Sequence, residues 1–286
     1  MDAVVRQYIR GAAITVLLYF DTIALLVALY TGSYASILAI LAMKTMSYVP
    51  YYIKRAVLNI YTEYLGFVLV TRFTHTNMYK STGRHVIYGA HPHNVVPLQF
   101  IWYAQQGIAC AVDPTMLSCV TPYFFKVLSA SSVRRDPLVR RMRAEQQIVM
   151  SPGGADEMIE HHVPGSHLLD LRVHHGLFIL ALTHDVVLVP SLSMQETRCY
   201  STYVTNWCKW LWVRWHIPFV PHVGFLHVVP GVPQCHINNR LNLYQSELGI
   251  DPRDYRSPED METAYKAEVE RMAHTHGGML VRWRCS

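Results

Sequence analysis

The stretch Val86-Ile87-Tyr88-Gly89-Ala90-His91-Pro92-His93-Asn94 places a short apolar run directly before a polar turn. A run of this length that ends at a turn signal is typical of a buried strand. The same arrangement recurs downstream, where Ile148–Met150 is followed by Ser151-Pro152-Gly153-Gly154. We therefore expect both polar segments to lie just beyond the ends of strands.

The chain after the first motif alternates between strand and helix patterns. Asp136-Pro137 predicts a helix with the aspartate as N-cap and proline at its first position. Leu177–Leu182 has the pattern of a helix and precedes a third buried strand at Val186–Val189. Ser257-Pro258-Glu259-Asp260 predicts a further helix that runs to about His274. This alternation favours an α/β fold.

Residues 12–43 form an apolar stretch whose only charged member is Asp21. The part from Ala12 to Tyr30 is long enough for a helix to cross a bilayer, and the break at Thr31-Gly32-Ser33 predicts a shorter returning arm. We expect a membrane hairpin within residues 1–55 and one catalytic domain over residues 56–286. A cleaved signal peptide is the competing interpretation. Lys54–Val70 is compatible with an interfacial helix or a strand.

The composition also favours contact with a membrane. Hydrophobic residues make up 51% of the 286 residues and charged residues only 16%, below the roughly 25% of soluble domains. A net charge of +5 suits an anionic membrane surface or a phosphorylated cosubstrate, and we expect no nucleic-acid partner. The six cysteines have no CxxC spacing, which predicts reduced thiols on the cytosolic side.

The His91-Pro92-His93 turn offers a general base. Proline restricts the backbone conformation of the residue before it and fixes its own φ angle. We therefore expect the two imidazoles to project in a defined way. Imidazole can accept a proton from an alcohol near neutral pH. A histidine pair alone is a weak signal, because the chain has 16 histidines and most histidines are hydrogen-bonded surface or core residues.

The second motif, Pro152-Gly153-Gly154-Ala155-Asp156-Glu157, brings small residues next to an acid. Consecutive glycines let the backbone approach a ligand and direct N–H groups at an anion or a developing oxyanion. Glu157 could orient a histidine. By itself the segment also fits an ordinary strand-to-helix turn with a solvated acid.

Together the two motifs resemble the HPHG and GGxxE blocks of the type 2 diacylglycerol acyltransferase family, which includes monoacylglycerol acyltransferases and wax synthases. Arg135-Asp136 is similar to the family's Arg-Asp pair before a helix, and Leu171–Phe178 is similar to its LRxRxGF block. Leu188-Val189-Pro190 with Gln195 and Tyr200 resembles the family's LVP strand and the segment after it. The apolar hairpin also occupies the family's place, so the resemblance covers nearly the whole chain.

The resemblance implies a glycerolipid-acyltransferase-like mixed sheet with flanking helices, preceded by the membrane hairpin. It implies transfer of a fatty acyl group from acyl-CoA to a lipid alcohol, most directly diacylglycerol to give triacylglycerol. Monoacylglycerol acylation and wax ester synthesis are the alternatives within the family. The expected location is the endoplasmic reticulum membrane with the catalytic domain facing the cytosol, or the lipid droplet. Acyl-CoA is the expected cosubstrate, and no metal or other cofactor is expected. Whether the protein forms a homo-oligomer is left open by the sequence.

The resemblance also assigns roles to individual residues. We expect His93, His91 and Glu157 to be catalytic, with His93 favoured as the base and the ranking of the two histidines left open. Asn94 replaces the family's glycine, and His174 and His175 stand where the family has basic residues. The expected substrate-binding residues are Asn94, Arg135, Gly153, Gly154, Arg172 and His175.

Two functions from other classes are alternatives. Histidine pairs suggest a metal-dependent membrane hydrolase, although the chain has no HExxH helix or Cys/His ligand set. A non-catalytic lipid-binding protein would keep the hairpin and the basic residues but would not need His93. The histidine pairs are His91/His93, His161/His162, His174/His175 and His274/His276.

Overall fold

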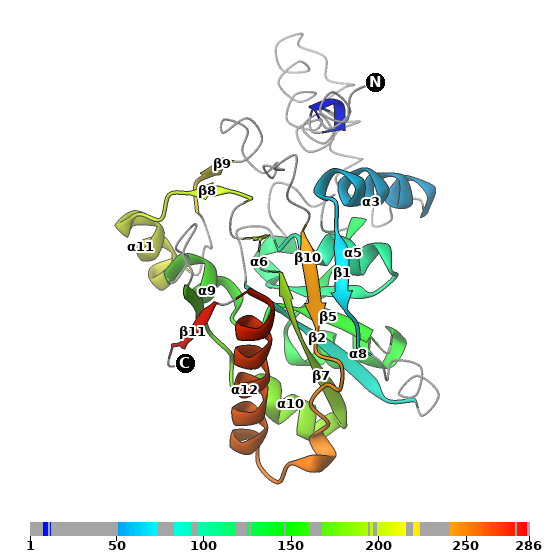
Figure 1. Cartoon of the computed structure of the whole chain (residues 1–286), viewed down its shortest axis with the longest axis vertical. Coiled ribbons are helices and arrows are strands. Elements are labelled where there is room, and N and C mark those ends of the chain that lie inside the picture. Colours follow the sequence, from blue (N-terminus) through cyan, green and yellow to red (C-terminus); the bar gives the residue numbers. More distant parts are fainter. Residues whose placement is uncertain are drawn as a thin grey trace.

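The protein is described by a computed structural model (Figure 1), which covers residues 8–10, 12, 51–73, 83–92, 97–117, 125, 127–145, 147–160, 168–193, 195–196, 199–215, 220–223, 241–277 and 279–284. The expected hairpin over residues 12–43 lies outside the described residues except for Ala12. His93 and Asn94 also lie outside them.

A seven-stranded sheet forms the centre of the fold, in the order β1-β10-β7-β2-β5-β3-β4. The five strands from β7 to β4 are mutually parallel, whereas β10 runs antiparallel to β7 and is parallel to β1. The sheet is therefore mixed, as the family resemblance implied, and it is rich in parallel pairs. Its strands are β1 (Val68–Thr71), β2 (His85–His91), β3 (Ala109–Val112), β4 (Ser131–Ser132), β5 (Gln147–Met150), β7 (Val186–Ser193) and β10 (Asn242–Gln245).

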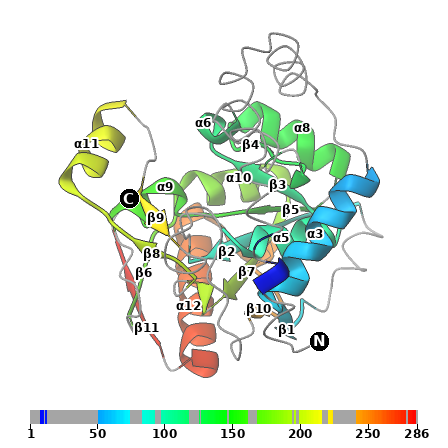
Figure 2. The same cartoon turned by 90° about the horizontal axis from the view of Figure 1, so that it is seen from above.

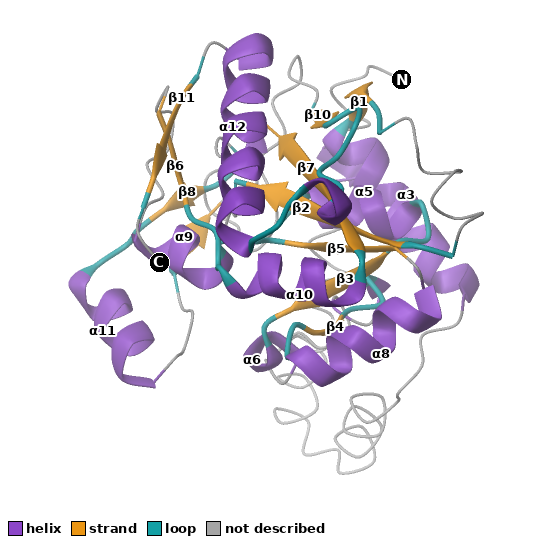
Figure 3. Cartoon of the chain, turned by 90° about the horizontal axis from the view of Figure 1, so that it is seen from below, coloured by secondary structure: helices purple, strands orange, loops and turns teal. Residues whose placement is uncertain are grey.

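Helices cover both faces of this sheet (Figure 3), with α3 and α5 on one face and α8, α10 and α12 on the other. Two small two-stranded sheets, β11-β6 and β8-β9, lie outside it. The remaining elements are α3 (Tyr51–Leu65), α5 (Gln99–Gln105), α6 (Pro114–Leu117), α8 (Arg135–Glu145), α9 (Gly154–Glu160), β6 (Leu168–Leu171), α10 (Gly176–His184), β8 (Ser201–Thr202), α11 (Asn206–Trp215), β9 (His222–Val223), the 3₁₀ turn η3 (Pro252–Asp254), α12 (Pro258–Gly277) and β11 (Leu280–Trp283).

The side chains of β2 alternate between the two cores. Val86, Tyr88 and Ala90 pack with α3 and α5, whereas Ile87 packs with α10 and α12. Because the side-chain period of a strand is two, His91 shares the face of Ile87. This alternation directs the imidazole of His91 toward α12.

The strands predicted at the two motifs are confirmed as β2 and β5, and the third as the longer β7. The helix predicted at Leu177–Leu182 is α10, and the helix predicted near Ser257 is α12. The predicted start of α8 was wrong. Leu138 N–H donates to Arg134 O, so Arg134 takes the cap position and Asp136 lies in the first turn. Proline is tolerated in that turn, so Pro137 did not mark the boundary.

The segment Lys54–Val70, for which helix and strand were both open, contains the end of α3 and the start of β1. The boundary expected between residues 55 and 56 falls inside α3, which buries Leu58, Tyr61 and Tyr64 against the core. Among the described residues, no helix has the length and apolar character needed to cross a membrane. Cys110, Cys199 and Cys208 are buried free thiols.

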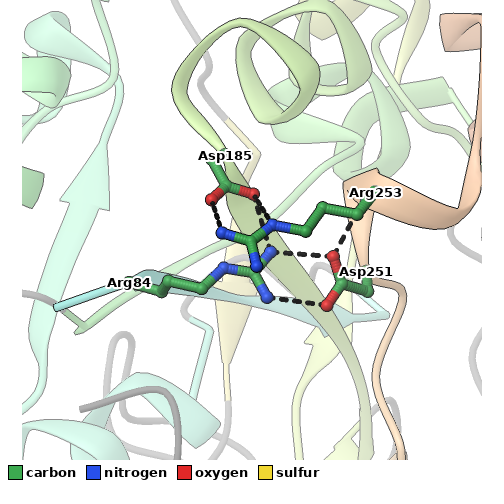
Figure 4. A network of polar contacts seen from close by, with 4 residues as sticks. All are labelled: Arg84, Asp185, Asp251 and Arg253. Atoms are coloured by element: carbon green, nitrogen blue, oxygen red, sulfur yellow. Dashed lines mark hydrogen bonds and ion pairs between the residues drawn. The ribbon is translucent and has the colours of Figure 1, made fainter. Parts of the chain in front are cut away.

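The amino ends of β2 and β7 are joined by a cluster of four charged residues (Figure 4). Arg84, which is buried, donates to Asp185 and to both carboxylate oxygens of Asp251 at 2.7 Å. Arg253 completes the cluster by donating to Asp185 at 2.6 Å. We call Arg84, Asp185, Asp251 and Arg253 the amino-end clamp. Opposite charges are matched within it, which is the arrangement that lets a guanidinium be buried.

Candidate active site

The two sequence motifs meet at the carboxyl edge of the sheet. His91 ends β2, and the turn from Ser151 to Gly154 follows β5, its direct neighbour in the sheet. Gly154 then begins α9, which carries Glu157 (Figure 2). Parallel strands present their carboxyl ends at one edge, so the parallel pairing of β2 and β5 brings these segments together.

The imidazole of His91 is fully buried, and protein groups face both of its ring nitrogens. Nε2 lies 3.1 Å from the hydroxyl of Tyr265 on α12. Nδ1 lies 3.6 Å from Oε1 of Glu157, which is also buried. The ring makes further edge contacts with Tyr265 and Trp283. His91 therefore sits inside the protein, between an acid and a phenol.

The contact between Tyr265 and His91 depends on Gly89. A Cβ atom at Gly89 would lie 2.0 Å from the Tyr265 hydroxyl, a separation that atoms cannot adopt. Gly89 is on the same face of β2 as His91, two residues earlier. A glycine inside a strand often marks such a close approach. The absent side chain lets Tyr265 reach the end of the strand, where burial raises the pKa of its hydroxyl well above the usual range.

Glu157 is held against the glycine turn by a similar fit. A Cβ atom at Gly153 would lie 2.2 Å from Oε2 of Glu157 and 2.7 Å from the backbone oxygen of Arg172. Gly154 has φ +56°, and its N–H donates to Ser151 O at 3.1 Å. The two glycines thus have separate roles, since Gly153 makes room for the carboxylate and Gly154 closes the turn.

Several polar atoms at this edge are buried without a hydrogen bond. Among the described residues, neither carboxylate oxygen of Glu157 nor Nδ1 of His91 has a hydrogen-bond partner. A buried carboxylate without hydrogen bonds destabilises the folded state, and natural proteins keep few such groups. Unsatisfied groups beside a histidine at a sheet edge mark this place as the candidate catalytic site.

Arg172 lies on the other side of the glycine turn. Its Nη1 contacts Asp156 Oδ2 at 2.7 Å, and Trp212 donates to the other oxygen of Asp156 at 2.5 Å. His174 is bonded to the turn through its N–H, which donates to Pro152 O at 3.1 Å. The structure therefore brings Arg172 close to Gly153, with its guanidinium paired to an acid.

Two further predicted substrate-binding residues make their contacts outside this cluster or are exposed. His175 contacts Glu262 at 2.9 Å and Glu259 at 3.5 Å, both on α12. Arg135 is exposed at the start of α8. That helix follows β4, which is three strand positions from β2, or roughly 14 Å at the usual strand spacing. In the described part of the chain, no three His, Cys, Asp or Glu residues gather as a metal site would require.

A second polar cluster holds the backbone of the histidine motif. Gln99 Nε2 donates to His91 O at 2.8 Å, and the backbone N–H groups of Leu98 and Gln99 donate to Glu196 at 2.5 and 3.3 Å. Ser191 donates to Gln99 Oε1 at 3.2 Å and accepts from Tyr103 at 2.8 Å. We call Gln99, Glu196, Ser191 and Tyr103 the backbone support. It fixes the chain on both sides of residues 93–96.

Glu196 and Tyr265 are the residues that the sequence interpretation missed. Burial raises the pKa of Glu196 to about 8, although backbone hydrogen bonds from Leu98 and Gln99 oppose the change. A single acid after the apolar strand at Val186–Val189 was a usable signal for Glu196. For Tyr265 the only signal in the sequence was indirect, and it was the presence of Gly89 inside the predicted strand.

Comparison with known proteins identifies the family of this sequence. The family model described as "Diacylglycerol acyltransferase" matches residues 16–223, well over half of the chain. The chain belongs to the diacylglycerol acyltransferase family. The matched range includes both motifs, Arg172 and His175, but ends before α12 and therefore before Tyr265.

Individual members of the diacylglycerol acyltransferase family match over a shorter part. "Diacylglycerol O-acyltransferase 1" of Saccharomyces cerevisiae is 28% identical over 139 residues, which are 44% of this chain and 33% of that protein. "Diacylglycerol O-acyltransferase 2" of Bos taurus is 25% identical over 163 residues, or 50% of this chain and 44% of that protein. The matched part spans less than half of the length of these curated relatives.

A solved structure of another acyltransferase also shows similarity. It is the 1-acyl-sn-glycerophosphate (LPA) acyltransferase PlsC from Thermotoga maritima, at 13% identity and a TM-score of 0.47, covering 94% of this chain and 98% of that one.

Proposed function

We propose that this protein is a membrane-bound O-acyltransferase that transfers a fatty acyl group from acyl-CoA to a lipid hydroxyl, with diacylglycerol as the acceptor and triacylglycerol as the product. The observation that supports it most is that the match to the diacylglycerol acyltransferase family includes the histidine and glycine motifs, which adjoin at one sheet edge. Monoacylglycerol and long-chain alcohols are the alternative acceptors.

In the proposed mechanism His93 is the general base. The acceptor oxygen bonds to the thioester carbonyl carbon as its proton passes to the imidazole of His93. Backbone N–H groups of the glycine turn stabilise the oxyanion. Collapse of the tetrahedral intermediate breaks the carbon–sulfur bond, and His93 returns the proton to the sulfur of CoA. The products are an ester and free CoA, without a covalent acyl-enzyme.

The surroundings of His91 support a positioning role for it. Its ring is buried, and its two nitrogens face Tyr265 and Glu157. If Tyr265 donates to Nε2, then Nδ1 carries the proton and points at the Glu157 carboxylate. This tautomer turns an N–H of His91 toward the acid, at 3.6 Å, a distance too long for a hydrogen bond, and it would leave His91 to position the end of β2 next to His93 in the sequence. Glu157 would orient His91 electrostatically.

The remaining assignments are proposals of the same kind. Residues 1–55 would anchor the chain in the endoplasmic reticulum membrane or at lipid droplets, and residues 56–286 would form the cytosolic catalytic domain. Asn94, Gly153, Gly154, Arg172 and His175 would contribute to substrate binding. Acyl-CoA would be the cosubstrate. Deleting residues 12–43 should weaken membrane association, and sedimentation of membranes measures it.

Product analysis tests the activity directly. Microsomes that contain the protein are incubated with labelled acyl-CoA and a panel of diacylglycerol, monoacylglycerol and long-chain alcohol, and the products are separated by chromatography. We expect labelled triacylglycerol. Absence of transfer to every acceptor, with the protein present at a normal level, would reject the proposal. Loss of activity on chelation that zinc restores would favour the hydrolase alternative.

Arg135 provides a separate test of acyl-CoA binding. Because guanidinium groups bind phosphates and Arg135 is exposed at the carboxyl edge, we expect Arg135→Ala to raise the KM for acyl-CoA about tenfold with little change in kcat. The matched control is Arg256→Ala, an exposed arginine in the loop between η3 and α12. An unchanged KM in folded Arg135→Ala protein would remove this residue from the site.

A further inference from the structure

Helix α11 carries four of the six tryptophans of the protein. Trp207, Trp210 and Trp215 each expose more than half of their side-chain surface, and Val213 exposes 71%. Single apolar residues at a surface are ordinary, but several tryptophans on one short helix form a patch that usually has a partner.

Three of the exposed residues of α11 lie away from its buried side. Cys208 is buried, and Trp212 packs with Met158, Ile159 and Val220 while it donates to Asp156. At 100° per residue, Trp207, Trp210 and Val213 project away from that side. Figures 1 and 2 both show α11 at the periphery of the molecule, beside α9. The apolar face is therefore a surface of the folded protein.

The charges on α11 indicate what covers this face. Lys209 and Arg214 are exposed among the aromatic residues, and the helix contains no acidic residue. Indole rings have an apolar body and a polar N–H, so they favour the boundary between lipid headgroups and acyl chains. Basic residues beside them suit lipid phosphates. The helix has ten residues, too few to cross a bilayer but enough to lie in its interface.

We propose that α11 docks into the interface of a membrane that contains anionic lipid, with Trp207, Trp210 and Val213 among the headgroups and Lys209 and Arg214 on phosphates. This docking does not require the transferase activity. It has a consequence for that activity, because the Trp212–Asp156 bond ties α11 to the residue beside Glu157. The membrane surface would then lie next to the glycine turn, where a lipid acceptor could enter without crossing water.

Tryptophan fluorescence tests the proposal with the full chain. The purified protein is reconstituted into vesicles of phosphatidylcholine and phosphatidylserine whose acyl chains carry bromine near the headgroup, a short-range quencher. We expect at least a twofold loss of emission relative to unbrominated vesicles. A variant with Trp207, Trp210 and Trp215 replaced by serine should lose most of the quenchable signal, because Trp212 packs against the protein and Trp102 and Trp283 lie in other elements.

Charge reversal supplies the matched comparison. Arg214→Glu keeps every tryptophan and should reduce the quenching at least twofold, whereas Arg256→Glu, an exposed arginine in the loop before α12, should leave it unchanged. Circular dichroism checks that both variants fold. Unquenched tryptophan in vesicle-bound protein, or equal effects of the two reversals, would overturn the proposal. The quenching assay contains no acyl-CoA, so its result is independent of the transferase activity. Quenching can be absent while acyl transfer in detergent is observed, and quenching can be observed while acyl transfer is absent.

Discussion

The two ends of strand β2 differ in how their buried charged groups are bonded. At the amino end, Arg84 is enclosed by Asp185 and Asp251, and Arg253 adds the balancing charge. At the carboxyl end, Glu157 lies beside His91 with no hydrogen bond to either oxygen among the described residues. The strand between them is only seven residues long.

This difference between the two ends of β2 indicates that the amino end contributes to stability and the carboxyl end to function. Paired charges such as the amino-end clamp hold strands in place, and losing one partner leaves the other charge uncompensated. A buried acid without hydrogen bonds weakens the fold, so its presence at a sheet edge indicates a role in chemistry. We therefore expect changes at the carboxyl end to affect rate more than stability, and changes at the amino end to do the reverse.

The largest effect on rate is expected at His93. His93→Ala should lower acyl transfer by about 10² to 10⁴, the usual loss when a general base is removed, with protein level and membrane association preserved. Labelled product from microsomes measures it. The rate of the wild type should also fall as the pH drops through the pKa of the base, because only neutral imidazole accepts a proton. Near-normal transfer by folded His93→Ala protein would contradict the mechanism.

A smaller loss is expected at Glu157. Glu157→Gln keeps the shape but removes the carboxyl group beside His91, so we expect kcat to fall about tenfold to a hundredfold, which is roughly 1.4 to 2.7 kcal/mol. Stability should stay the same or rise, since a buried carboxyl group without hydrogen bonds is gone. Thermal unfolding and kcat are measured on one preparation.

Glu196→Gln is the control for that variant. Glu196 is also buried, but its two carboxyl oxygens accept hydrogen bonds from the backbone N–H groups of Leu98 and Gln99. An amide has only one acceptor oxygen and would place its NH2 group against one of these N–H donors, so Glu196→Gln should lower the free energy of unfolding by about 1 to 3 kcal/mol, whereas Glu157→Gln should not. Equal losses of stability in the two variants would show that Glu157 has no special role.

The α/β sheet and the proximity of His91 to Glu157 were predictable because they depend on local patterns. Apolar runs that end at turns gave β2 and β5, and the parallel pairing of such strands brings His91 and Glu157 to one edge. Tyr265 was not predictable in this way, because it lies on a helix far along the chain and its contact depends on packing. The start of α8 was misplaced because proline in the first helical turn does not fix which residue is the cap.

The next prediction tests the contact that the sequence did not reveal. Tyr265→Phe removes the hydroxyl near His91 Nε2, and a hydrogen bond worth about 1 kcal/mol corresponds to a loss of about fivefold in kcat. Gly89→Ala should act in the same direction, because its Cβ would displace that hydroxyl. If both act through the same contact, the double variant should lose less than the product of the single losses. Independent, multiplicative losses would argue against the shared contact.

The smallest effect on rate is expected at the amino-end clamp. Arg84→Met should leave the kcat of folded protein unchanged but lower stability by about 2 kcal/mol, less than the loss for a fully buried pair because Asp185 and Asp251 are partly exposed.

Burial alone would raise the pKa of Asp185, but hydrogen bonds from Arg253 and Arg84 outweigh it and hold the pKa below the usual range. An acid with a lowered pKa stabilises the fold above its unfolded pKa of about 3.9, and this stabilisation is lost as the pH falls through the folded value. The stability difference between wild type and Arg84→Met should therefore be full at pH 6 and shrink below about pH 4. Thermal unfolding of both proteins across this range measures it, and a difference that grows on acidification would mean that the clamp does not act through these carboxylates.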